Sequence, residues 1–270
     1  MPFFEMNNGK LFYEIKGTGK KEIAVVFLNG VMTTTASWAL YYPLFEKLGY
    51  SVLLHDFKGQ MKSDKPKGPY TFKDHASDLK QLLDYLEIKK IHIISTSYGS
   101  QVGLRFAMDY PDETGSLTII GGASEIDDNA RLFVEGWKKF AEKGSGEEFF
   151  WGVVPSIYHN DFVSANRGFL DERAQLLNEI HPDYFKGQIN LYDTFINDTT
   201  MTGELEKIGC PSLVLVGEED KLMPRKFSEI LVKKIPQAEF AIIPNAAHVT
   251  IFEQPEVVKS IITGFVVKNT

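Results

Sequence analysis

The sequence predicts an α/β protein with a mostly parallel sheet of about eight strands, helices on both faces of the sheet and an inserted helical cap. Strand-like and helix-like segments alternate over most of the 270 residues, which is typical of right-handed crossovers between parallel strands. Residues 23–28 are apolar at every position, as expected for a strand buried on both faces. Residues 124–200 break the alternation and have little strand character, so we expect helices there.

The individual elements follow from apolar periodicity and from turn residues. Before the insertion, strands are expected at residues 3–5, 11–15, 23–28, 50–55, 91–94 and 116–120, and helices at 38–48, 72–86 and 99–110. Within the insertion, helices are expected at 128–142, 146–155, 171–179 and 184–195. After it, strands at 212–217 and 240–243 alternate with helices at 224–235 and 255–267. The chain thus divides into a core domain of residues 1–123 and 201–270 and a cap subdomain of residues 124–200.

Composition excludes several classes of protein. The net charge is −7, from 29 basic and 36 acidic residues without a long run of either sign, which argues against nucleic-acid binding. The one cysteine, Cys210, cannot form an intramolecular disulfide, and this favours a reducing compartment. No segment approaches the roughly 18 consecutive apolar residues of a membrane span. We therefore expect a cytoplasmic protein.

Ser97 lies between the strand and the helix expected within residues 91–107. A strand that becomes a helix within a few residues must bend sharply, so the turn needs small neighbours. Ser95 and Gly99 supply them, and the sequence fits the nucleophile elbow G-x-S-x-G except that serine replaces the first glycine. The alternative is an ordinary strand–turn–helix junction with an incidental serine.

Two further residues complete a candidate catalytic triad. A serine nucleophile needs a base, and the base needs an orienting acid. Because sites of doubly wound proteins lie at the carboxyl ends of strands, we looked there for a carboxylate and a histidine. Asp220 follows the strand at 212–217, and His248 follows the strand at 240–243. Ser97, Asp220 and His248 are therefore the predicted catalytic residues.

Alternatives exist for both partners of the serine. Glu218 and Glu219 are neighbours of Asp220, which is preferred because Pro224 starts the next helix and places Asp220 inside the loop. His55 also lies at a strand end, but its strand precedes the elbow. Taken singly, Asp220 would most often be a solvated loop residue and His248 an ordinary structural histidine.

A tetrahedral intermediate needs two hydrogen-bond donors for its oxyanion. One is the backbone N–H after the nucleophile, that of Tyr98, and the other comes from the loop after the strand at 23–28. Val31 N–H is the predicted second donor, with Met32 as its neighbour and Gly30 allowing the backbone to turn inward. An ordinary strand-end turn is the alternative.

From about residue 10 to 267 the chain resembles the α/β-hydrolase superfamily. The matching motifs are the elbow, Gly217…Asp220…Pro224, His248 with Glu253-Gln254-Pro255, and Asp56–Ser63, which is similar to the family's D-x-R-G-x-G-x-S. Lys58 and Met61 depart from that last motif, and Asn29-Gly30 stands where the family commonly has His-Gly. Residues 28–38 and 95–99 also resemble the 3-hydroxyacyl transferases that make the lipid precursor of rhamnolipids, whose elbow likewise begins with serine.

The insertion is rich in aromatic residues, most of which must pack it against the core. Some are expected to line an apolar pocket above Ser97. The candidate substrate-binding residues are Asn29, Gly30, Met32, Trp137 and Trp151.

The sequence thus predicts a serine hydrolase that cleaves a small carboxylic ester or thioester through an acyl-enzyme, without a metal or cofactor. The first alternative is an acyltransferase that uses the same triad to condense 3-hydroxyacyl groups. The second is a non-catalytic binding module, since fold does not fix function.

Overall fold

The computed structural model describes residues 2–17 and 23–270, so Met1 and residues 18–22 of the predicted core domain lie outside the described residues. The described residues form one eight-stranded sheet with the order β1-β2-β4-β3-β5-β6-β7-β8. The strands are β1 (Phe3–Met6), β2 (Gly9–Lys16), β3 (Ile23–Leu28), β4 (Ser51–His55), β5 (Lys90–Thr96), β6 (Thr114–Ile120), β7 (Ser212–Gly217) and β8 (Ala238–Ile243). β2 pairs antiparallel with β1 and β4, and all other pairs are parallel, which confirms the mostly parallel sheet.

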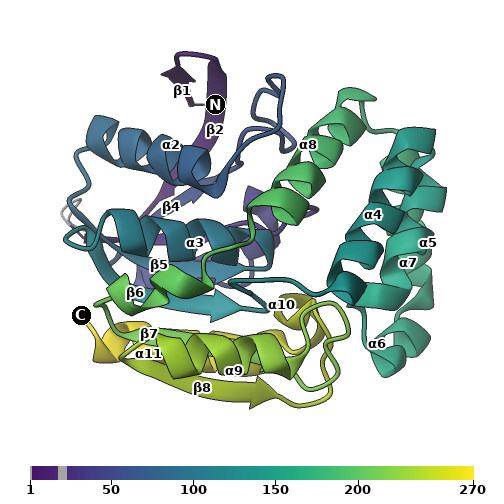
Figure 1. Cartoon of the computed structure of the whole chain (residues 1–270). Coiled ribbons are helices and arrows are strands. Elements are labelled where there is room, and N and C mark those ends of the chain that lie inside the picture. The colour runs from purple at the N-terminus through teal and green to yellow at the C-terminus, as the bar shows by residue number, and fades with distance from the viewer. Residues whose placement is uncertain (1, 18–22) are drawn as a thin grey trace.

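Side chains of the central strands alternate between two apolar cores. In β3, Val26 and Leu28 belong to one core, whereas Val25 and Phe27 belong to the other. The first core includes side chains of α2 (Phe72–Tyr85), α3 (Tyr98–Asp109) and α9 (Arg225–Lys234), and the second includes side chains of α1 (Tyr42–Lys47) and α11 (Pro255–Lys268). Helices therefore cover both faces of the sheet, as the fully apolar strands require (Figure 1).

Residues 124–200, which we call the helical insertion, lie between β6 and β7. Their helices are α4 (Asp128–Lys143), α5 (Gly146–Ile157), α6 (Asn160–Ala165), α7 (Arg167–Asn178) and α8 (Asp183–Asp198). In Figure 1 the arrowheads of β6 and β8 point toward the end of the sheet where α4 to α7 stand, and α8 leads back across that end. The insertion is thus placed beside the carboxyl ends of the strands. That the helical insertion forms a separate cap subdomain stays a prediction.

Most predicted elements occur within a few residues of their expected bounds, with one exception. The helix expected at 38–48 is instead a 3₁₀ helix at Thr35–Trp38, followed by α1 from Tyr42. The Thr34 side chain caps the first of these, and Pro43 suits the start of the second because proline lacks the N–H that a helix interior needs. The six-residue α6 was not predicted, since none of its residues is buried and it has no apolar periodicity.

Short elements complete the described chain. A second 3₁₀ helix, Thr202–Lys207, leads from the insertion into β7, and α10 (Thr250–Glu253) follows the loop after β8. Over residues 2–17 and 23–270, no helix combines the length and the apolar character needed to cross a membrane.

Candidate active site

Ser97 occupies a sharply bent junction between β5 and α3. Its backbone has φ +50° and ψ −124°, a conformation that side chains with a Cβ rarely adopt. A Cβ on Gly99 would lie 2.5 Å from the carbonyl oxygen of Leu28, so only glycine lets α3 start this close to β3. The junction therefore has the bend that the predicted elbow requires.

Ser95 explains why the first glycine of the elbow motif is replaceable here. Its side chain is fully buried, and its Oγ donates to the carbonyl of Thr118 in β6 at 2.6 Å. The hydroxyl thus has a hydrogen-bond partner and fits beside the helix.

The structure brings the three predicted catalytic side chains together at the carboxyl end of the sheet. His248 Nε2 lies 2.8 Å from Ser97 Oγ, and His248 Nδ1 lies 2.8 Å from Asp220 Oδ2. Asp220 Oδ1 accepts from the N–H of Met223 at 2.8 Å, which fixes the carboxylate. With a carboxylate accepting at Nδ1, Nε2 is left as the acceptor for the serine hydroxyl.

The alternative residues lie elsewhere. Glu218 accepts from the N–H of Asn245 at 3.3 Å, and Glu219 is exposed, 3.4 Å from His159 Nε2. His55 is buried, neither of its ring nitrogens has a partner among the described residues, and burial lowers its pKa to about 4. Among the described residues, none of the three side chains forms a hydrogen bond or ion pair with Ser97 or His248.

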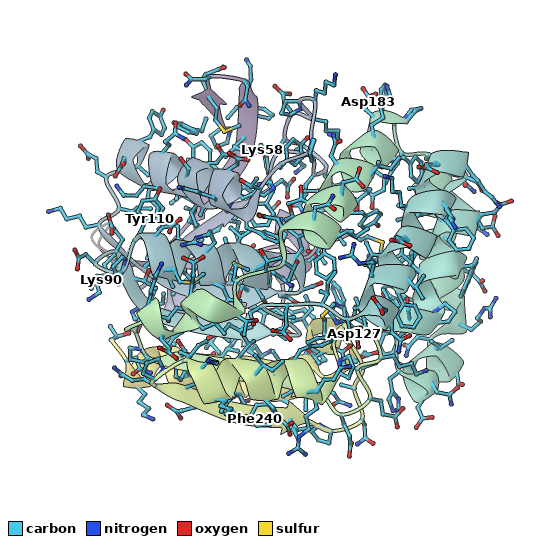
Figure 2. All side chains as sticks on the ribbon, viewed as in Figure 1. Lys58, Lys90, Tyr110, Asp127, Asp183 and Phe240 are labelled. Carbon is cyan, nitrogen blue, oxygen red and sulfur yellow. The ribbon has the colours of Figure 1, made fainter. Side chains whose placement is uncertain are left out.

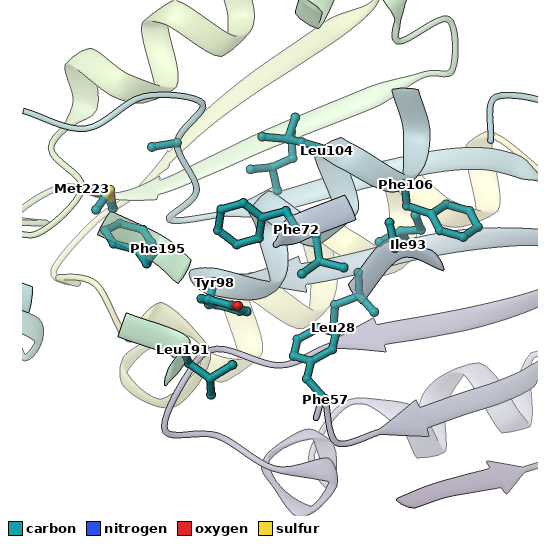
Figure 3. Close-up of a cluster of buried hydrophobic side chains, with 14 of the residues drawn as sticks. Leu28, Phe57, Phe72, Ile93, Tyr98, Leu104, Phe106, Leu191, Phe195 and Met223 are labelled. Atoms are coloured by element: carbon teal, nitrogen blue, oxygen red, sulfur yellow. The ribbon is translucent and has the colours of Figure 1, made fainter. Parts of the chain in front are cut away.

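The residues that carry the predicted oxyanion donors line one small cavity beside the serine. Val31, Ser97 and Tyr98 all line a space of about 10 Å³, roughly enough for one water-sized group. Within the described chain, neither Val31 N–H nor Tyr98 N–H makes a hydrogen bond. The Tyr98 ring packs against the rings of Phe57 and Phe72, with centres 6.0 and 5.1 Å apart, in the buried cluster that Figure 3 shows.

Two glutamines that were not predicted hold the loop that carries Val31. Gln60 Nε2 donates to the carbonyl of Gly30 at 2.7 Å, and Gln188 Nε2, from α8, donates to the carbonyl of Val31 at 3.0 Å. Both side chains are fully buried. Gln60 lies in the Asp56–Ser63 motif, which is a signal in the sequence, whereas nothing in the sequence distinguishes Gln188 from other helical polar residues.

A further residue that was not predicted, Glu253, holds the loop of the histidine. Its Oε2 accepts from the N–H of Ala247 at 2.7 Å, and its Oε1 accepts from the N–H of His159 at 2.6 Å. Burial raises the pKa of this carboxyl group. Glu253 thereby connects the chain next to His248 with the start of α6.

An apolar cavity of about 50 Å³ adjoins the triad. Its walls include Ser97 and His248 together with the predicted Gly30, Val31, Met32 and Trp137. A larger cavity of about 300 Å³ continues from it, since Met32, Thr33, Ile157, Val249 and Phe252 line both. This volume is typical of a site for a small organic molecule.

The structure does not bring two candidate substrate-binding residues to these cavities. Asn29 is fully buried, and its side chain donates to the carbonyl of His55 at 2.9 Å and to Asp56 at 3.1 Å while accepting from Trp38 at 2.8 Å. Its role is to join the ends of β3 and β4. Trp151 instead stacks against the guanidinium of Arg167, 4.1 Å from the ring centre, and lines neither cavity described above.

The comparison with known families agrees with this arrangement. The profile of the α/β hydrolase fold family matches residues 23–160, just over half of the chain. The chain belongs to the α/β-hydrolase family. Its fold, with the sheet described above, is the fold of that family.

Individual relatives of this α/β hydrolase cover nearly its whole length. RutD of Azorhizobium caulinodans, to which carbamate hydrolysis is attributed, is 26% identical over 98% of both chains. The crystal structure of MGS-M2, an α/β hydrolase from a deep-sea metagenome library of the Medee basin, is 26% identical with a TM-score of 0.92 and covers 98% of this chain and 97% of its own. The enol-lactonase of Burkholderia xenovorans, 22% identical with a TM-score of 0.88 over 98% and 100%, shares the fold. Family and relatives together support a hydrolytic enzyme.

Proposed function

We propose that this α/β hydrolase is a serine hydrolase that cleaves a carboxylic ester or thioester through an acyl-enzyme. The observation that carries the proposal is the continuous set of 2.8 Å contacts from Ser97 Oγ through the His248 ring to Asp220 Oδ2. In the same place, the small cavity beside the serine is lined by Val31 and Tyr98, whose backbone N–H groups make no hydrogen bond within the described residues.

The proposed reaction proceeds in two balanced halves. Ser97 Oγ attacks the carbonyl carbon while its proton passes to His248 Nε2, and Asp220 stabilises the imidazolium that results. Val31 and Tyr98 N–H donate to the oxyanion. When the tetrahedral intermediate collapses, the bond to the leaving oxygen or sulfur breaks, and His248 returns the proton to it. A water molecule then attacks the acyl-enzyme with His248 as base, which releases the acid and restores the serine.

The substrates attributed to the relatives are compatible with this chemistry. A carbamate and an enol-lactone are both attacked at a carbonyl carbon that bears a heteroatom leaving group, and a lactone is itself an ester. The apolar walls around Ser97 favour an acyl group over a strongly polar one. These points support an acyl substrate without selecting the natural one.

Labelling with a fluorophosphonate probe tests the proposal, because such probes react with activated serines. We expect one label per chain in the wild-type protein and in the control Ser260→Ala, since the Ser260 hydroxyl is on the exposed side of α11 and donates to the Glu256 carbonyl at 2.8 Å. Ser97→Ala should lose both the label and hydrolysis of p-nitrophenyl esters. An unlabelled wild-type protein without esterase activity would instead indicate a binding module.

Mass spectrometry separates hydrolysis from acyl transfer. With a 3-hydroxyacyl thioester as substrate, we expect free 3-hydroxy acid as the main product, since water needs no second binding site. A dominant 3-(3-hydroxyacyloxy) acid would overturn this expectation and favour the transferase.

A further inference from the structure

The larger cavity beside the triad is apolar except at one part of its wall. Among the described residues that line it, only Arg173 carries a charge. Most of the other walls are formed by apolar side chains of α5, α7 and the loops near Ser97: Met32, Met61, Phe150, Val153, Val154, Ile157, Leu176, Leu177, Ile180, Val249 and Phe252. Arg173 is half-buried, and a guanidinium that is partly withdrawn from water gains from an anionic partner.

Arg173 has no anionic partner in the part of the chain that the structure describes. Its guanidinium lies near two aromatic rings, 5.5 Å from the centre of Phe169 and 5.6 Å from that of Phe252, and it makes no hydrogen bond or ion pair there. Arg167 on the same helix differs, because Asp171 lies 3.3 Å from its Nε. The charge of Arg173 is therefore available to a ligand.

Two hydroxyl groups accompany this charge. Tyr158 and Tyr184 line the same cavity, and neither hydroxyl makes a hydrogen bond within residues 2–17 and 23–270. Burial raises the pKa of both tyrosines, and the charge of Arg173 opposes that shift, which places Arg173 near both phenols. Both side chains are thus neutral donors on the cavity wall that Arg173 shares.

The charged side chains at the outer rim of the cavity do not provide an anionic partner for Arg173. Met61, Ile180 and Tyr184 also line an open hollow whose charged residues are Lys62, Lys65, Lys186, Asp64 and Asp183. Asp183 bonds Lys186 at 2.7 Å, and Asp64 accepts from the N–H of Lys10 at 3.0 Å. Figure 2 shows Asp183 at the outer end of α8. Lysines outnumber aspartates at this rim, so its charges do not repel an anionic ligand on its way to Arg173.

We infer that Arg173, with the Tyr158 and Tyr184 hydroxyls, binds a carboxylate at the far end of the acyl chain that Ser97 attacks. The preferred substrates would then be half-esters or half-thioesters of dicarboxylic acids, with the apolar walls enclosing the methylene groups between the two ends. A guanidinium recognises a carboxylate by charge-assisted hydrogen bonds. This inference names the substrate class of the proposed hydrolase, and in that respect it rests on the proposed function.

A matched pair of esters tests the inference. For acyl chains of four to eight carbons, kcat/KM is measured for the p-nitrophenyl half-ester of the dicarboxylic acid and for the methyl-terminated ester of equal length. We expect the wild-type enzyme to favour the half-ester at one chain length, and Arg173→Gln to reduce that ratio about 10- to 100-fold, as the loss of a charge-assisted bond predicts. Arg173→Glu should invert the ratio, whereas Arg167→Gln should leave it unchanged.

A binding measurement separates the two ways in which the experiment can fail. Ser97→Ala and Ser97→Ala/Arg173→Gln are titrated with monomethyl adipate and dimethyl adipate, which differ only in the carboxylate. Selective binding of the monomethyl ester that is lost with Arg173 supports the carboxylate site even if no ester is cleaved, in which case only the proposed function fails. Serine-dependent cleavage with a ratio that Arg173→Gln does not change would overturn the inference and leave the hydrolase intact.

Discussion

Ser97 has a backbone conformation that its own side chain disfavours. At φ +50° and ψ −124° glycine is unstrained, whereas serine or alanine is strained by roughly 1–3 kcal/mol. We therefore expect Ser97→Gly to be more stable than Ser97→Ala by about 1 kcal/mol, after allowing for the greater entropy of unfolded glycine. Urea unfolding of the two inactive variants measures the difference. Equal stabilities would mean that the elbow relaxes in solution.

Asp220 contacts both His248 and the N–H of Met223. Asp220→Asn keeps the size of the side chain but replaces the carboxylate that accepts from His248 with an amide. The proton of the neutral imidazole is then no longer held on Nδ1, so Nε2 is no longer kept free to accept from Ser97. We expect kcat to fall by up to about 10⁴-fold with little change in the circular dichroism spectrum. Glu218→Gln and Glu219→Gln are the matched controls, and a comparable loss in either of them would contradict the assignment of Asp220.

His55 makes stability depend on pH. Burial lowers its pKa from 6.5 to about 4 in the folded protein, so between these values the unfolded chain binds more protons than the folded one. The free energy of unfolding should fall as the pH is lowered from about 6.5 to 4, by up to about 1.4 kcal/mol per pH unit from this residue.

Denaturant titrations of the wild type and His55→Gln across this range test that expectation. The variant should show a shallower dependence on pH, whatever its absolute stability. The exposed His181→Gln is the control, and an equal change in slope there would contradict a special role of burial at His55.

At the scale of elements, α8 contacts the loop of the proposed oxyanion donor. Gln188→Leu removes the donor to the Val31 carbonyl, which should let Val31 N–H turn away from the serine. Complete loss of an oxyanion donor lowers kcat by about 10²- to 10³-fold. Because Gln188→Leu misorients the Val31 N–H without removing it, we expect kcat to fall by about 10-fold, with a smaller change in KM. The exposed Gln175→Leu on α7 is the control. A change confined to KM would indicate a role in binding instead.

The elements show where sequence patterns are informative. β3 and β7 were predicted with their observed bounds because β3 is apolar at every position, β7 is apolar at residues 213–216, and the residues that flank both runs change character abruptly. The start of α1 was wrong, since the cap at Thr34 and the position of Pro43 decide it more than apolar spacing does. α6 has no fully buried residue and only two partly buried apolar ones, Phe162 and Val163, so no hydrophobic pattern predicts it.

At the scale of the whole molecule, Glu253 joins the loop of His248 to the helical insertion. Glu253→Gln would set an amide NH₂ against one of the two backbone N–H groups that the carboxylate now accepts. We expect the free energy of unfolding to fall by about 1–3 kcal/mol and kcat to fall with it, because the histidine loop loses an anchor. Thermal unfolding and steady-state kinetics measure both, with the exposed Glu256→Gln as control. Full activity in Glu253→Gln would show that the loop needs no such anchor.

The candidate site was predictable only where the fold itself brings residues together. Ser97, Asp220 and His248 each follow a strand, and the parallel sheet places those strand ends side by side. Asn29 also follows a strand, but its side chain turns into the protein toward Asp56, a direction that no pattern reveals. Gln188 and Arg173 reach the site from helices of the insertion, whose packing cannot be read from spacing alone.

The carbonyl of Ile157 has a consequence for protein engineering. It accepts from the N–H groups of both His248 and Val249, at 3.0 and 3.3 Å. These two hydrogen bonds fix the loop of the histidine to the last turn of α5. A chimera that exchanges residues 124–200 for the corresponding segment of another hydrolase would keep His248 in place only if the new segment has a backbone carbonyl at the position of the Ile157 carbonyl. Grafts should therefore be chosen by the position of this single backbone oxygen before the pocket they bring is considered.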